Sequence, residues 1–86
     1  MPVDQEKLDA LGLQTSAFKV LCFLAFKDVA LKPSEIADGI DEKPSTDRAR
    51  LTELKSSGLV ESKPGGWVSN VRPYDIIMKI YRELRA

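Results

Sequence analysis

The sequence has no histidine and a single cysteine, Cys22, and these two absences exclude most of the common catalytic chemistries. Without histidine there is no Ser-His-Asp triad, no Cys-His dyad and no haem ligation by histidine. One cysteine excludes a disulfide within the chain and leaves no Cys/His zinc site. The 13 Asp and Glu residues keep carboxylate chemistry open, but no nucleophile is paired with a base. We therefore predict a protein that is not an enzyme and that uses no cofactor or metal.

Long apolar runs are also missing. None approaches the roughly 18 residues of a membrane span, and the acidic, polar start MPVDQEK does not have the pattern of a signal peptide. These features favour a cytoplasmic protein that does not contact membranes. A length of 86 residues suits one domain, and a composition with 43% hydrophobic and 30% charged residues is typical of a folded one. We expect a single domain over residues 1–86.

Neither sign of charge is in excess, since 13 basic residues balance 13 acidic residues, but the charges are unevenly distributed. Residues 1–43 contain five Lys and eight acids, a net charge of 5 − 8 = −3. Residues 44–86 contain eight Lys and Arg and five acids, a net charge of 8 − 5 = +3, and include every arginine. This asymmetry predicts that an anionic partner would bind the second half of the chain.

Apolar spacing and capping residues predict helices over residues 4–11, about 16–28, 33–40, 44–57 and 73–85. Each of the last three begins with a proline at its first position, and Gly58 suits the end of the 44–57 helix. The 16–28 helix is apolar around nearly its whole circumference, which requires burial on more than one side. In the 73–85 helix, the expected buried stripe consists of Ile76, Ile77, Ile80 and Leu84.

Residues 59–63 and 67–71 read as two strands joined by the turn Pro64-Gly65-Gly66, which predicts a β-hairpin. An isolated hairpin is marginally stable, so this one has to pack against helices. The predicted fold class is therefore mainly α with a small β-hairpin, in the order of a winged helix-turn-helix. In that layout the 44–57 helix enters the major groove, and the hairpin, or wing, follows the phosphates.

From Leu11 to about Ile80 the chain resembles the winged-helix domain of archaeal TrmB-like regulators and, more loosely, the MarR group. The resemblance lies in LGLQTSAFKVLCFL, LKPSEIADGI, KPSTDRARLTELKSSGLVES and VRPYDIIMKI. It implies a DNA-binding transcriptional regulator that is usually a dimer. No residue pattern identifies an effector, an operator sequence or the sign of regulation.

Helical geometry, at about 100° per residue, predicts which side of the 44–57 helix would face DNA. Leu51 and Leu54 define its buried direction, and a ridge of small residues lies opposite, with arginines on both flanks. The predicted nucleic-acid-binding residues are Ser34, Lys43, Ser45, Thr46, Arg48, Ala49, Arg50, Thr52, Lys63 and Gly65. The alternative is a solvated face with local ion pairs, such as Arg50 with Glu53.

We expect a homodimer on double-stranded DNA, with the helices at about 16–28 and 73–85 forming the interface, because both carry more apolar residues than a small core can cover. The rival hypothesis is a winged helix that serves as a protein-interaction module in a larger assembly, which the zero net charge favours.

One residue departs from the expected pattern. Asp47 lies within about 10° of the buried direction, where an apolar residue is expected, so we predict that Asp47→Val stabilises the fold. The alternative is that Asp47 orients Arg48 or Arg50 for binding, or contacts a partner.

Overall fold

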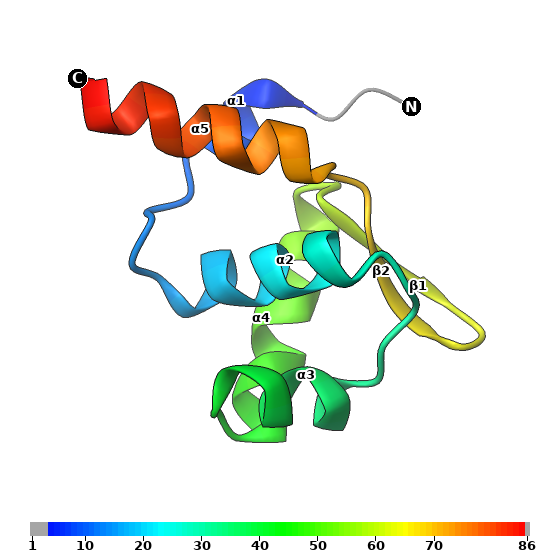
Figure 1. Ribbon diagram of the computed structural model, residues 1–86. Coiled ribbons are helices and arrows are strands. Elements are labelled where there is room, and N and C mark those ends of the chain that lie inside the picture. The colour runs from blue at the N-terminus through cyan, green and yellow to red at the C-terminus, as the bar shows by residue number, and fades with distance from the viewer. Residues whose placement is uncertain (1–3, 86) are drawn as a thin grey trace.

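The computed structural model describes residues 4–85, in which five helices and a two-stranded antiparallel sheet follow one another along the chain (Figure 1). The helices are α1 (Gln5–Asp9), α2 (Ser16–Lys27), α3 (Pro33–Ile40), α4 (Pro44–Ser56) and α5 (Pro73–Arg85). The strands β1 (Val60–Lys63) and β2 (Gly66–Ser69) lie between α4 and α5. The predicted fold class, mainly helical with one small hairpin, is confirmed.

Helix α2 is the centre of the fold and packs against α3, α4, β2 and α5. Thr15 begins it, since the Thr15 hydroxyl accepts a hydrogen bond from the Phe18 N–H at 3.2 Å. Six of its residues are buried, namely Ala17, Phe18, Val20, Leu21, Leu24 and Ala25. The expectation that this helix is covered on more than one side is confirmed, and the covering elements come from the same chain.

Helix α3 approaches α2 closely because Gly39 has no side chain. A Cβ at this position would lie 2.1 Å from an atom of the Phe23 ring, well inside van der Waals contact. The Phe23 ring therefore occupies the space that any other residue would need. Asp41 then ends α3 in the left-handed conformation (φ 58°), and the chain turns directly into α4.

The hairpin is a two-stranded sheet closed by the pair Lys63–Gly66, with Pro64 and Gly65 in the turn. A short bridge extends it: Leu31, between α2 and α3, exchanges two backbone hydrogen bonds with Trp67, at 3.0 and 2.7 Å. Gly66 permits this approach, because its φ is 137° and a Cβ would lie 2.5 Å from the Leu31 carbonyl oxygen. The wing is thus fastened to the segment that enters α3.

The buried face of α5 differs from the predicted stripe. Ile76 is buried and Ile80 is half-buried, but Ile77 and Leu84 are exposed, so their placement in the core was wrong. Apolar residues occupy two stripes of this helix, and a domain of this size covers only one of them. The covered stripe also contains Lys79, whose side chain is 0% exposed.

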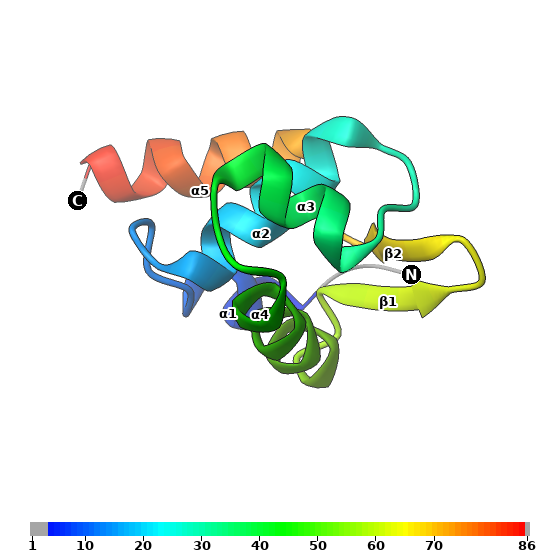
Figure 2. The same cartoon turned by 90° about the horizontal axis from the view of Figure 1, so that it is seen from below.

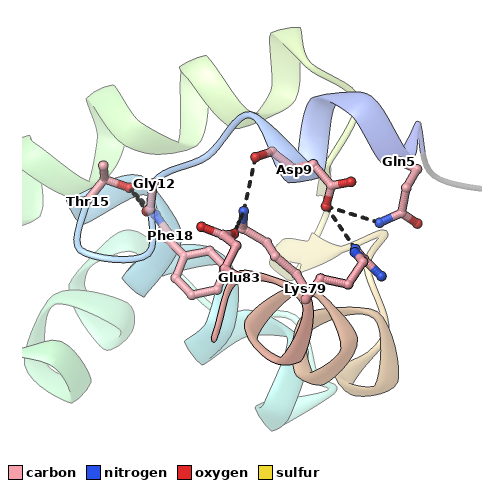
Figure 3. A network of polar contacts seen from close by, with 8 residues as sticks. Gln5, Asp9, Gly12, Thr15, Phe18, Lys79 and Glu83 are labelled. Atoms are coloured by element: carbon pink, nitrogen blue, oxygen red, sulfur yellow. Dashed lines mark hydrogen bonds and ion pairs between the residues drawn. The ribbon is translucent and has the colours of Figure 1, made fainter. Parts of the chain in front are cut away.

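Polar contacts fasten α1 to α5 around Lys79, as Figure 3 shows. The Lys79 ammonium donates to the Asp9 carbonyl at 3.2 Å, pairs with Glu83, and lies 5.7 Å from the centre of the Phe18 ring. Arg82 donates to the Asp9 carboxylate at 2.8 Å, and this hydrogen bond lowers the pKa of Asp9. Helix α1 is shorter than the predicted 4–11, because Asp4 caps it and the helix ends at Asp9.

Within residues 4–85, no helix combines the length and the apolar character needed to cross a bilayer.

Candidate nucleic-acid interface

The outer face of α4 follows the geometry predicted from its sequence. Leu51 and Leu54 are buried against the core, at 0% and 1% exposure. The residues that point the other way are exposed, namely Ser45, Arg48, Ala49, Thr52, Glu53 and Ser56, while Thr46 is half-buried. Seen from below in Figure 2, α3, α4 and the hairpin lie on the near side of the molecule, and α5 lies behind them. Helix α4 therefore presents a ridge of small side chains to solvent.

The hydroxyl groups on this ridge are oriented by the helix itself. Thr52 donates its hydroxyl proton to the Arg48 carbonyl at 3.0 Å, and Ser56 donates to the Thr52 carbonyl at 3.2 Å. Each hydroxyl oxygen keeps lone pairs that can accept hydrogen bonds, for example from a base amino group. The ridge is small enough to approach a base edge and polar enough to read one.

The two arginines on the flanks of α4 have different surroundings. Arg48 is exposed, and within residues 4–85 it takes part in no ion pair. Arg50 is only 34% exposed and binds the Glu53 carboxylate at 3.1 Å, the local pairing that the sequence left as an alternative. Arg48 is thus available to an external anion, whereas Arg50 is partly neutralised by its own helix.

Lys55 is a cation that was not among the predicted interface residues. It is exposed, follows Arg48 by seven residues on the same flank of α4, and its ammonium lies 6.0 Å from the centre of the Trp67 ring in the wing. The seven-residue spacing was visible in the sequence, but the contact with Trp67 was not. Arg48 and Lys55 together form a basic flank that runs along α4 toward the wing.

The predicted contacts at the starts of α3 and α4 are exposed. Ser34 lies in the first turn of α3, and Lys43 immediately precedes α4. The start of α3 already carries an anion, because the Glu35 carboxylate accepts the Lys32 N–H at 2.8 Å. The N–H groups of Glu35 and Ile36 donate to the Lys32 carbonyl. These bonds leave fewer N–H groups at the start of α3 open to a phosphate.

The wing residues Lys63 and Gly65 are exposed at the tip of the hairpin, which extends beyond the helices (Figure 2). Lys63 lies 3.6 Å from the Glu61 carboxylate, and both side chains are about half exposed, so water weakens this pair. The structure therefore places the predicted residues in two groups, one on α3 and α4 and the other at the wing tip.

Beneath the ridge, on the inner face of α4, Asp47 is 0% exposed, as its helical position predicted. Burial is the main cause that raises its pKa, to about 6, and the neighbouring Glu42 carboxyl raises it further. Glu42 itself accepts a hydrogen bond from the Ser16 hydroxyl at 2.8 Å, and this bond lowers its pKa. Within residues 4–85, three buried polar atoms of α4 have no hydrogen-bond partner, namely both carboxylate oxygens of Asp47 and Nε of Arg50.

These features define the class of protein. A pair of helices joined by a tight turn, an exposed polar ridge on the second helix, and a hairpin wing beside it make up a winged helix-turn-helix DNA-binding domain. Residues 12–83 match the family model described as the winged helix-turn-helix transcription repressor, HrcA DNA-binding. The chain belongs to this family.

The family match confirms the prediction of a winged helix-turn-helix regulator, but it does not place the chain among the TrmB-like or MarR-like groups. No curated protein and no solved structure gave a significant match.

Proposed function

We propose that this protein is a transcriptional regulator that binds specific sequences of double-stranded DNA, with α4 in the major groove and the wing along the phosphates. The main support is the outer face of α4, where a ridge of small hydroxylated residues lies beside the basic flank of Arg48 and Lys55. The membership of a family of repressor DNA-binding domains supports the same conclusion. The proposal includes the cytoplasmic location that was predicted from the sequence.

Replacing both Arg48 and Arg50 by alanine should weaken binding to duplex DNA and flatten its dependence on salt. Removing one phosphate contact should reduce the slope of log K against log [salt] by about 0.9. Of the two single variants, Arg48→Ala should weaken DNA binding more than Arg50→Ala, since Arg50 is already bound to Glu53. Affinity should be measured by fluorescence anisotropy at several salt concentrations.

The matched control is the double variant Lys7→Ala and Lys27→Ala, which removes the same charge from exposed positions on α1 and α2. This control should keep the wild-type slope of log K against log [salt]. An Arg48/Arg50 variant that folds normally and retains both affinity and slope would count against α4 as the DNA-binding helix, and would favour the protein-interaction hypothesis.

We propose further that the protein acts as a homodimer through α5. Four large apolar residues on its outer face are each more than half exposed, namely Tyr74, Ile77, Tyr81 and Leu84. Their spacing of three, four and three residues is that of a helix–helix seam. Helix α2 should contribute less to the dimer interface than the sequence suggested, because other elements of the same chain cover most of it. Within the described structure, Phe26 is its one large exposed apolar residue.

Sedimentation equilibrium should therefore show a dimer at micromolar concentrations. The double variant Ile77→Glu and Leu84→Glu should be monomeric with an unchanged helical content, because it places charges in the seam while leaving the buried residues of α5 intact. A wild type that sediments as a monomer would contradict the homodimer.

A further inference from the structure

Two of the large exposed apolar side chains lie outside the proposed α5 seam. Within residues 4–85, six large apolar residues are more than half exposed, and four of them form the seam. The other two are Phe26, near the end of α2, and Val29, just beyond that helix, and each is 56% exposed. The seam therefore accounts for only part of the exposed apolar surface.

A cavity connects these two residues to the seam. Its volume is about 570 Å³, and it lies between the end of α2, β2 and the start of α5, which meet at the base of the hairpin (Figure 1). Phe26, Val29 and Tyr74 all line this cavity. Because Tyr74 is also the first residue of the seam, the cavity and the seam form one continuous apolar surface. A surface of this kind on a small soluble domain marks an interaction site.

The seam alone is small for a stable dimer. A large side chain that is about half exposed offers roughly 100 Å² of surface, so four of them supply roughly 400 Å² on each protomer. A specific, stable interface buries about 800 Å² on each partner. A dimer built on α5 therefore needs a second contact area, and the cavity adjoins the seam.

The length of α5 determines which part of a second copy can reach the cavity. Tyr74 and Leu84 lie about 15 Å apart along the helix axis, at 1.5 Å per residue. In an antiparallel pair of α5 helices centred on the seam, Leu84 of the partner subunit lies beside Tyr74, and the two-fold axis repeats this contact at the other end. In a parallel pair, the two Leu84 side chains would meet each other and the cavity would stay open.

The charges at the two ends of α5 favour the antiparallel pair. Asp28 lines the cavity and Arg85 follows Leu84; both are exposed, and within residues 4–85 neither takes part in an ion pair. Arg72, the cation in the cavity lining, is already paired with Asp75 at 3.5 Å. An antiparallel pair brings Arg85 of the partner subunit to the end where Asp28 lies, and it also opposes the two helix dipoles. A parallel pair places both Arg85 side chains at the same end.

We propose that the cavity receives the last turn of α5 from a second copy of this chain, with Leu84 of the partner subunit packed between Val29 and Tyr74. This proposal rests on the homodimer proposed above and specifies how its two subunits fit together. The contact occurs twice, once at each end of the paired helices. Since β2 forms one wall of the cavity, the partner's helix also touches the wing.

Cysteine cross-linking tests this contact. In a Cys22→Ala background, which removes the one native thiol, the variant Val29→Cys/Leu84→Cys is treated with a short bis-maleimide and analysed on a denaturing gel. Most of the chain should become covalent dimer, because each new cysteine lies beside the other one in the partner subunit. The two cysteines of one chain lie near opposite ends of α5, so the reagent does not join them within a chain.

Two controls fix the orientation and the place of the contact. Leu84→Cys alone, in the same background, should not be cross-linked, since the two Leu84 positions lie at opposite ends of an antiparallel pair. Lys43→Cys/Leu84→Cys is the matched control, because Lys43 is exposed but lies just before α4 and does not line the cavity. It should run as a monomer on the gel.

A charge in the cavity provides an independent test without new thiols. Val29→Glu should weaken dimerisation in sedimentation equilibrium by at least about tenfold, because it places an anion in an apolar contact. Val29 is exposed in the single chain, so the variant should keep its helical content. Combining it with Leu84→Lys should recover most of the lost affinity, since the lysine supplies the opposite charge.

The outcomes separate this contact from the homodimer itself. If the wild type dimerises but Val29→Cys/Leu84→Cys is not cross-linked, or Leu84→Cys alone is, the cavity contact is overturned and the homodimer stands. Val29→Glu with the dimer affinity of the wild type would also overturn the contact, and would leave the cavity open to another occupant, such as a small apolar molecule. A wild type that sediments as a monomer overturns both proposals.

Discussion

Lys79→Ala is expected to lower the free energy of unfolding by about 2–3 kcal/mol. The variant removes a side chain that is fully buried and leaves the Asp9 carbonyl at the end of α1 without its donor. It also removes the partner of Glu83, but that carboxylate is 41% exposed, so water stabilises its charge. The expected change is therefore smaller than the roughly 3–5 kcal/mol typical of breaking a fully buried pair. Urea denaturation at pH 7.5 measures the difference.

Two further variants separate the contributions of Lys79. Lys79→Met preserves the length of the aliphatic stem and should lose only about 1 kcal/mol, through the missing hydrogen bond to α1. Arg82→Ala removes the neighbouring, largely exposed contact with Asp9 and should change stability by less than about 1 kcal/mol. A Lys79→Ala variant as stable as the wild type would show that α1 does not depend on this lysine.

Asp47→Val is expected to raise the free energy of unfolding by about 1–2 kcal/mol at pH 7.5, because it replaces a buried acid by an apolar side chain. The effect should depend on pH. The pKa of Asp47 is about 6 in the folded protein, above its ordinary value of 3.8. The folded state therefore binds the proton more tightly, and the stability contributed by this group is complete below pH 3.8 and is lost as pH rises through 6.

Valine does not titrate, so the advantage of the variant should be small at pH 4.5 and largest above pH 7. Urea denaturation of both proteins at the two pH values provides the measurement, and Asp41→Asn, an exposed acid in the adjacent turn, serves as the control for a general loss of negative charge. A less stable Asp47→Val at both pH values would show that Asp47 is a well-satisfied structural anion.

The starts of α3, α4 and α5 and the end of α4 were readable from the sequence, because local chemistry determines them. The second strand was less well predicted, since β2 spans Gly66–Ser69 and not 67–71. Pro33, Pro44 and Pro73 each occupy the first position of a helix, and Gly58 takes a positive φ of 76° just beyond α4. The buried and exposed faces of α4, including the burial of Asp47, followed from the helical period alone.

Contacts between distant segments were not readable in this way. Lys79 pairs with Glu83 in its own helix, but it also donates to the Asp9 carbonyl, 70 residues earlier in the chain. This second contact, which accompanies its burial in the covered stripe of α5, could not be read from a local pattern. The bridge between Leu31 and Trp67 also joins separate segments, and it lies outside the regular hairpin pattern. In the candidate interface, spacing predicted the ridge but could not show that Arg50 is partly enclosed while Lys55 reaches the wing.

The bridge between Leu31 and Trp67 also gives the protein an internal optical reporter. Trp67 is the single tryptophan of the chain, it is half-buried, and the Lys55 ammonium lies near its ring. Indole emission responds to polarity and to nearby charge, so excitation at the tryptophan band observes one defined place, the joint between the wing and the helix-turn-helix. Ligands that move the wing, and variants that loosen it, can therefore be followed in the unlabelled protein.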